Sequence, residues 1–496
     1  MLEALDLTRI AGERWYRHKL TNPGAAGAHV VDWAALEPGD LGYPLLLVVV
    51  KVDAAGRYFL PIVASHHDHG GFGVLGPGSV EVTVDECAGS ELEGRPRVQL
   101  GDAASTGTYA NYILRLIDEG MTIPSEKGTF VFRRLGKPTW NATTGSDAYS
   151  NSMVFADASV ALKTFRLLAG GVNPEVEIGQ ALAQHTRFHE TARALGYVSY
   201  IDCDGIEQSI AMVSQRVDNK GDAWSCISEN LSEALNTGAL TGAATPRAIR
   251  ELGGTIARLH FALASVPEAG FRCRPAGTGD VARWVSSYHS RADEAMGTLN
   301  VALEHGLISD ELLPLSERVL NHVPCYLGVS PLERNLGADF GSVIRCHGDL
   351  HLGQILMAKD GGHAVIDFEG EPLAPLATRR SLTSPARDLA GMLRSFSYAA
   401  RSVSRRAGAS RDDQALLANW EHAACEAFLS GYSDELRRCG IELLPREPEA
   451  TMLLCHFSAE KAFYELTYEL NNRPDWAGIP LSGLIALADQ WGGGSN

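Results

Sequence analysis

Two carboxylates and one amide lie in an order that suits phosphoryl transfer. Residues 346–355 read CHGDLHLGQI, and residues 366–372 read IDFEGEP. Asp349 and Asp367 are 18 residues apart, and Gln354 follows Asp349 by five residues. A carboxylate can accept the proton of an attacking hydroxyl, and amide and carboxylate oxygens are ligands that Mg²⁺ prefers. The order therefore predicts Asp349 as a catalytic base and Gln354 and Asp367 as metal ligands.

The elements around these residues should bring them together. Residues 342–346 form an apolar strand before Asp349, and residues 355–358 and 363–367 read as a hairpin around the turn 359–362. Such a hairpin carries Asp367 back beside the loop of Asp349. Either motif alone occurs by chance. Both motifs in this order, each at the end of an apolar strand, favour a catalytic site over a solvated loop.

The composition indicates an acidic globular protein. The 496 residues carry 43 basic and 60 acidic side chains, which gives a net charge of −17. This charge offers no electrostatic basis for binding nucleic acid or an anionic membrane, and we expect no obligate protein partner. Because the same charge repels ATP, local cations and Mg²⁺ must compensate for it at the site.

Three features bear on the compartment. The first residues lack the basic and apolar regions of a signal peptide, and the longest apolar run, Tyr43–Val50, is too short to cross a bilayer. Nine cysteines without a CxxC spacing favour reduced thiols over a disulfide framework. We therefore expect a cytoplasmic protein.

The pattern of elements divides the chain into three parts. Residues 1–135 read as a separate α+β module, with strands at 45–52, 57–64, 80–84 and 129–133 and a helix near 108–119. Residues 136–221 are rich in strands. Residues 222–496 are mostly helical, with long helices at 411–432 and 448–471.

The second part carries residues suited to holding nucleotide phosphates. Ser150, Asn151 and Ser152 form a polar turn before a strand, where a phosphate-covering loop would lie. Lys163 then falls on an apolar strand. A lysine on such a strand is typical of kinases in which it holds the phosphates of ATP, whereas an ordinary surface lysine is the alternative.

A helix and a second strand complete this nucleotide site. Asn173 and Pro174 are a good helix start, and Glu177 follows in the first turn, where it would pair with the strand lysine. The strand at 209–217 includes Met212 and Gln215 and would lead into a hinge that contacts adenine.

Several longer motifs carry a family resemblance. They are RWY at 14–16, HGDLHLGQ at 347–354, DFEGEP at 367–372, SPARDLAGMLRSF at 384–396 and KAFYELTYE at 461–469. Together they resemble the maltokinase-like sugar kinases of the aminoglycoside-phosphotransferase-like superfamily. The resemblance implies an α+β, bilobal protein-kinase-like fold with an extra N-terminal cap domain at 1–135, an N-lobe at 136–221 and a C-lobe at 222–496. It also implies ATP as phosphate donor, Mg²⁺ as cofactor, Glu369 as a further metal ligand and Asp388 as a brace of the catalytic loop.

The sugar acceptor should lie between the catalytic loop and the C-terminal helices. Trp420 and Glu421 fall near one stripe of the helix at 411–432. The tryptophan face would stack on a sugar ring, and the carboxylate would pair with an amine. The alternative for Glu421 is a solvated helix surface.

A second polar stripe offers further acceptor contacts. Lys461, Tyr464 and Glu465 lie on one side of the helix at 448–471, and His351 lies in the catalytic loop. Surface pairing along the helix is the alternative for the charged residues. A carboxylate beside an aromatic favours an amino sugar, so we expect phosphorylation of glucosamine to glucosamine 6-phosphate. Phosphorylation of maltose to maltose 1-phosphate is the alternative, and an aminoglycoside kinase is more distant. A pseudokinase or regulatory binding protein would lack Lys163, Asp349 or Asp367, and all three are present.

Overall fold

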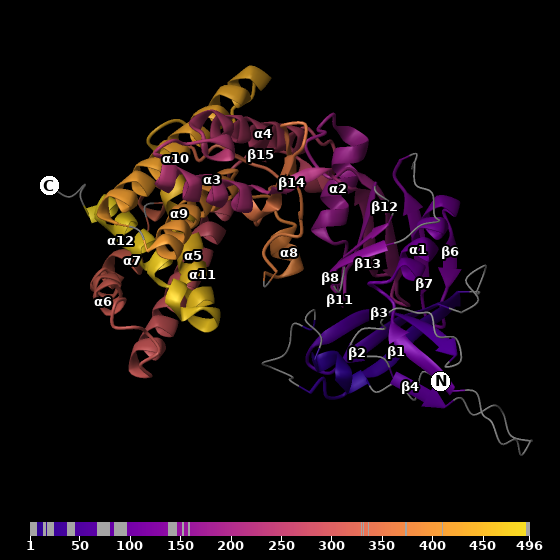
Figure 1. The fold of residues 1–496 in the computed structure, drawn as a ribbon. Coiled ribbons are helices and arrows are strands. Elements are labelled where there is room, and N and C mark those ends of the chain that lie inside the picture. Colours follow the sequence, from indigo (N-terminus) through magenta and orange to yellow (C-terminus); the bar gives the residue numbers. More distant parts are fainter. Residues whose placement is uncertain are drawn as a thin grey trace, which may run out of the picture. The chain divides into compact units, whose positions relative to one another are not determined.

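A computed structural model shows a mixed helix and sheet architecture in two compact units (Figure 1). Unit 1 comprises Met1–Gln184 and Ala192–Val217, and unit 2 comprises His185–Thr191 and Asp218–Asn496. The structure describes residues 7–12, 16, 24–36, 45–66, 80–83, 97–136, 146–150, 153–156, 159–328, 330, 332–335, 337–372, 374–408 and 410–492.

The first sheet of unit 1 is antiparallel and has the order β1-β2-β3-β5-β4, with β11 paired to β3. Its strands are β1 (His29–Leu36), β2 (Leu45–Val52), β3 (Gly56–His66), β4 (Val80–Thr83), β5 (Arg97–Asp102) and β11 (Leu167–Leu168), and the short helix η2 (Leu7–Gly12) precedes them. Strand β2 is apolar along almost its whole length because both its faces are covered. Leu45 and Leu47 belong to one core cluster, whereas Leu46 and Val48 belong to another.

The second sheet of unit 1 has the order β6-β7-β12-β13-β10-β9-β8. Its strands are β6 (Thr122–Pro124), β7 (Thr129–Arg134), β8 (Ser146–Ser150), β9 (Met153–Ala156), β10 (Val160–Thr164), β12 (Ala194–Ile201) and β13 (Glu207–Gln215). Strands β6 and β7 come from the predicted cap, yet they share this sheet with β10 of the predicted N-lobe. The sheet therefore spans the predicted boundary at 135/136, and the division into cap and N-lobe stays a prediction.

Two helices of unit 1 begin at side-chain caps. Helix α1 (Gly107–Glu119) confirms the predicted helix, and the Thr106 side chain accepts a hydrogen bond from the backbone N–H of Tyr109 at its start. Helix α2 (Pro174–His185) begins after Asn173, whose Oδ1 accepts from the Glu175 N–H at 2.9 Å. Both caps satisfy backbone donors that a helix start leaves open.

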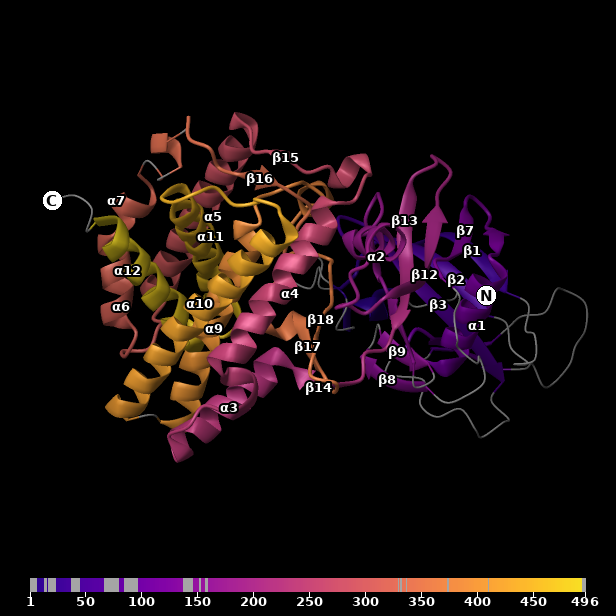
Figure 2. The ribbon, with the colours of Figure 1, turned by 90° about the horizontal axis from the view of Figure 1, so that it is seen from above.

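Unit 2 is mainly helical (Figure 2). Its α-helices are α3 (Ala223–Thr237), α4 (Pro246–Ala264), α5 (Thr278–Glu304), α6 (Leu313–Asn321), α7 (Val323–Tyr326), α8 (Leu376–Arg379), α9 (Ala386–Ala407), α10 (Arg411–Cys439), α11 (Glu449–Asn472) and α12 (Gly478–Gly492). Short 3₁₀ helices are η4 (Gly242–Ala244), η5 (Ala269–Phe271), η6 (Glu333–Asn335), η7 (Leu352–Gln354) and η8 (Pro474–Trp476). No helix among the described residues is long and apolar enough to cross a membrane.

Two small sheets join the helices of unit 2. One has the order β14-β17-β18, with β14 (Asn219–Asp222), β17 (Ile355–Ala358) and β18 (His363–Val365). The other pairs β15 (Arg274–Pro275) with β16 (Ser342–Val343). The hairpin β17–β18 confirms the one predicted around residues 359–362, and Ile355 lies opposite Val365 in its register.

Helices α4 and α10 run side by side because glycines remove the side chains between them (Figure 2). A Cβ at Gly253 would collide with the carbonyl oxygen of Phe428, and a Cβ at Gly431 would collide with that of Arg250. The apolar stripe of α4 is buried as its period of 3.6 predicts, at Ile249, Leu252, Ile256, Leu259 and Leu263.

Candidate active site

The loop that carries Asp349 is fixed by a buried carboxylate. Asp388 lies in the first turn of α9 and is 1% exposed. Its Oδ2 accepts the backbone N–H of His347 at 2.8 Å, and its Oδ1 accepts that of Gly348 at 2.9 Å. Gly348 has a φ of 86°, a conformation that glycine adopts without strain. The brace expected from the sequence is therefore present.

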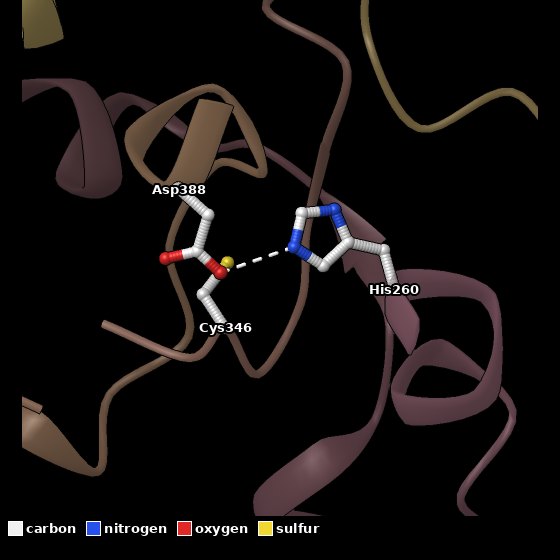
Figure 3. A group of neighbouring side chains, drawn as sticks. All are labelled: His260, Cys346 and Asp388. Atoms are coloured by element: carbon white, nitrogen blue, oxygen red, sulfur yellow. Dashed lines mark hydrogen bonds and ion pairs between the residues drawn. The ribbon is translucent and has the colours of Figure 1, made fainter. Parts of the chain in front are cut away.

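The same carboxylate belongs to a buried group with His260 and Cys346 (Figure 3). Three such ligand types within 4.8 Å of one another could hold a metal ion. Each, however, already has a partner. His260 contacts Asp388 at 3.0 Å and the Tyr432 hydroxyl at 2.9 Å, and the Cys346 thiol donates to the Ser384 carbonyl at 3.6 Å. Burial raises the pKa of Cys346, so the thiol stays protonated and the group serves as a structural support.

Asp349 lies against a buried ammonium. Its Oδ1 accepts a hydrogen bond from Lys461 Nζ at 2.9 Å, and the same nitrogen contacts Glu371 Oε1 at 3.2 Å. Burial lowers the pKa of Lys461, but Glu371 and Asp349 raise it more, so this pKa lies above its ordinary value. The carboxylate that could accept a substrate proton is therefore held beside a permanent positive charge.

A pocket opens beside Asp349 within unit 2. It encloses about 310 Å³, counting the part open to solvent, and its walls are Arg291, Gly348, Asp349, Leu350, Glu371, Arg387, Asp388, Gly391, Phe457, Glu460 and Lys461. Burial acts to raise the pKa of Glu371, but Lys461, Arg291 and Arg387 lower it to about 2. The wall thus presents four acidic side chains, Asp349, Glu371, Asp388 and Glu460, and three basic ones, Arg291, Arg387 and Lys461.

The predicted metal ligands of the loop and hairpin lie together. Gln354 Nε2 donates to Asp367 Oδ2 at 3.0 Å, and the backbone N–H of Ile366 donates to the Gln354 carbonyl at 3.0 Å. Asp367 has a φ of 66°, a left-handed conformation that costs energy for a residue with a Cβ and is common at functional sites. The Glu369 carbonyl accepts from Arg379 at 3.0 Å. An amide and a carboxylate held this way are a donor set that fits Mg²⁺.

In unit 1 the strand lysine forms an ion pair, but with a different acid from the one predicted. Lys163 Nζ lies 2.5 Å from Glu175 Oε2, whereas the sequence pointed to Glu177 in the same turn. Two residues along a helix differ by about 200° in direction, so their order alone cannot decide which one faces the strand.

The other residues predicted to contact the nucleotide differ in solvent exposure. Met212 lies opposite Lys163 in the sheet, is 6% exposed and packs in the core. Gln215 is exposed at the end of β13. Ser150 ends β8, and Asn151 and Ser152 lie outside the described residues. Their contacts with a nucleotide stay predictions.

The prediction that Trp420 stacks on a sugar is wrong. The side chain is 3% exposed, its Nε1 donates to the Ala244 carbonyl at 2.8 Å, and its ring meets Phe396 edge-on. No face of the ring is left for a ligand. Its neighbour Glu421 accepts a hydrogen bond from the Ser397 hydroxyl and is not part of the wall beside Asp349.

The second predicted stripe is partly at the pocket. Lys461 lines it, and its ammonium lies 4.9 Å from the centre of the Tyr464 ring. Glu465 instead forms an ion pair with Arg394 at 2.6 Å. His351 caps η7, because its Nδ1 accepts the Gly353 N–H at 3.1 Å, and burial lowers its pKa. Contacts of these residues with an acceptor stay predictions.

Sequence reasoning missed four charged residues of the pocket wall: Arg291, Glu371, Arg387 and Glu460. Glu371 and Arg387 lie inside motifs that carried the family resemblance, which was the available signal. Arg291 and Glu460 lie on helices α5 and α11 among many other charged residues. No local pattern separates them from a solvated helix face.

The fold and these two groups of residues define the class of protein. One unit carries a lysine on a strand that is paired with a glutamate on a helix. The other carries a braced aspartate loop followed by an amide and a second acid, and the two together are the organisation of a kinase with a protein-kinase-like fold. The chain belongs to the phosphotransferase enzyme family, whose model matches residues 142–428.

Relatives and solved structures agree with this assignment. The chain is 28% identical over 408 residues to a glucosamine kinase of Streptacidiphilus jiangxiensis, covering 82% of this chain and 84% of that protein. It is 26% identical over 349 residues to a glucosamine kinase of Mycolicibacterium smegmatis, covering 69% and 78%. The structure of a glucosamine kinase in complex with glucosamine, ADP and inorganic phosphate superposes with a TM-score of 0.66, at 23% identity and 93% coverage of both chains, which shows the same fold.

Proposed function

We propose that this protein is an ATP- and Mg²⁺-dependent kinase that phosphorylates glucosamine to glucosamine 6-phosphate. The main support is that both curated relatives described above are glucosamine kinases matched over more than two thirds of this chain. The pocket beside Asp349 supports phosphoryl transfer, because it gives an acceptor hydroxyl room next to a carboxylate that could take its proton.

In this proposal Asp349 accepts the proton of the primary hydroxyl of the sugar. The hydroxyl oxygen forms a bond to the γ-phosphorus, the bond from that phosphorus to the bridging oxygen breaks, and ADP leaves. Lys461, already 2.9 Å from Asp349, offsets the negative charge that gathers on the transferred phosphoryl group. Positioning and charge neutralisation account for most of the rate in such reactions.

The nucleotide and its metal are assigned to the remaining predicted residues. Lys163, held by Glu175, binds the phosphates of ATP. Gln354 and Asp367, with Glu369 as a further candidate, would hold Mg²⁺, which would neutralise the phosphate oxygens when bound. Gln354 and Asp367 lie on one loop and the hairpin that follows it, and their hydrogen bond holds the two side chains next to each other.

An acceptor panel tests this function. Purified protein with Mg²⁺ and ATP is assayed for ADP release with glucosamine, glucose, maltose and an aminoglycoside, and the product is located by phosphorus NMR. One charge-assisted hydrogen bond to the amine predicts a kcat/KM about 10- to 100-fold higher for glucosamine than for glucose. Turnover of maltose well above that of glucosamine would contradict the proposal, as would phosphate at another position than the primary hydroxyl.

A further inference from the structure

The first sheet of unit 1, called the N-terminal sheet below, and helix α1 contact the chain segment that carries Lys163. Strand β10 ends at Thr164, whose hydroxyl donates to the Tyr109 hydroxyl on α1 at 3.2 Å. Two residues later, Arg166 donates to Asp102 at the end of β5 through Nη1 at 3.1 Å and Nη2 at 2.6 Å. Both contacts reach elements that precede residue 120 in the chain.

The backbone repeats the same connection. The Phe59 N–H on β3 donates to the Arg166 carbonyl at 2.8 Å. Strand β11 follows at once and lies beside β3 (Figure 1). The two strands pair antiparallel, with Leu167 opposite Tyr58. The chain just after Lys163 is therefore part of the first sheet, whereas Lys163 itself is part of the second.

The ion pair between Arg166 and Asp102 consists of two hydrogen bonds, one from each terminal nitrogen of the guanidinium. The Arg166 side chain is 3% exposed and that of Asp102 is 34% exposed. Two parallel hydrogen bonds between a guanidinium and a carboxylate fix direction as well as distance.

The geometry fixes Lys163 from two sides. Its ammonium is held by Glu175, and its strand is held three residues further on by Asp102. Three extended residues span only about 10 Å, so we expect a displacement of the Arg166 backbone to displace Lys163 as well. Side chains alternate along a strand, so Thr164 points to the face opposite Lys163.

We propose that Asp102 is a positioning residue for nucleotide binding. Through Arg166 it sets the place of Lys163, so the N-terminal sheet takes part in binding ATP without touching it. This inference rests on the proposed role of Lys163 in holding the phosphates, and it is independent of which sugar is the acceptor.

The test measures binding of Mg-ATP to the full chain by titration calorimetry, with no sugar present. We expect Asp102→Asn to weaken binding about fivefold or more, the lower range of coupling between sites, and Asp102→Glu to restore part of the loss. Lys163→Met should weaken binding as well. Asp118→Asn is the matched control, because Asp118 pairs with Arg134 at the exposed surface of the same unit, and it should leave affinity within about twofold.

The outcomes separate the two claims. If Lys163→Met weakens binding while Asp102→Asn matches the Asp118→Asn control, the positioning role is overturned and the proposed function stands. If Lys163→Met has no effect, the assigned role of the lysine fails and this inference fails with it. If Asp102→Asn does not fold, judged by circular dichroism, Arg166→Lys takes its place, since it keeps the charge but loses the two-bond fork. Unchanged affinity in Arg166→Lys would overturn the inference.

Discussion

Replacing Asp388 by asparagine should destabilise unit 2 and slow catalysis together. The carboxylate accepts hydrogen bonds from His347, Gly348 and His260 and is 1% exposed. Asparagine keeps one acceptor oxygen and turns an NH₂ toward a donor. Losing one bond to a charged acceptor costs about 1.5–3 kcal/mol, and the buried N–H left without a partner costs about 1–3 kcal/mol more. The sum is about 2.5–6 kcal/mol, which lowers Tm by on the order of 10 °C.

Thermal melting and steady-state kinetics test this estimate. Asp293→Asn, an exposed position on α5, is the matched control and should melt like the wild type. Turnover of Asp388→Asn should fall on the order of 100-fold, because a displaced loop moves Asp349 out of line. Burial acts to raise the pKa of Asp388, but its bonds lower it below 3.8 overall, so the wild-type advantage is present above that pH and shrinks below it. Equal melting and turnover in both variants would refute the reasoning.

Three further changes probe other contacts. Gly391→Ala should lower the free energy of unfolding by about 1–3 kcal/mol and lower kcat, because a Cβ there would collide with the Leu350 carbonyl. Gly297→Ala, in open space on α5, is the control and should be neutral or stabilising. Equal effects of the two changes on melting would argue against the close approach at Gly391. Burial lowers the pKa of His456 from 6.5 to about 4. The neutral imidazole of the folded state therefore contributes stability that is fully present above pH 6.5, and about 3 kcal/mol of the free energy of unfolding is lost as the pH falls to 4. In denaturant titrations His456→Leu should remove this loss, and an unchanged dependence of the unfolding free energy on pH would count against it. Trp420→Phe removes the hydrogen bond to the Ala244 carbonyl, so it should lower the free energy of unfolding by about 1–3 kcal/mol. The KM for glucosamine should stay within about twofold. A tenfold rise in KM without loss of stability would instead support stacking of Trp420 on the sugar.

Local signals predicted much of the fold and the chemistry. The hairpin after Gln354, the start of α2 after Asn173 and the position of Asp388 in the first turn of α9 all depend on residues near one another in the sequence. Turns and caps have strong residue preferences, so such features can be read from one chain.

The partners of charged residues could not be read in the same way. Lys461 reaches Asp349 across 112 positions, and Arg166 reaches Asp102 across 64. Such pairs are set by the packing of whole elements. Trp420 failed for a related reason, because an aromatic residue on a helix has the same spacing whether it faces the core or a ligand.

The most direct test of the account is glucosamine phosphorylation by Asp349→Asn beside the wild type, with Mg-ATP binding measured on the same samples. Loss of a general base should lower kcat about 10²- to 10⁴-fold. Affinity for the nucleotide should stay within about twofold, because the lysine assigned to the phosphates lies in the other unit. Turnover of glucosamine at the wild-type rate by Asp349→Asn would contradict the central claim.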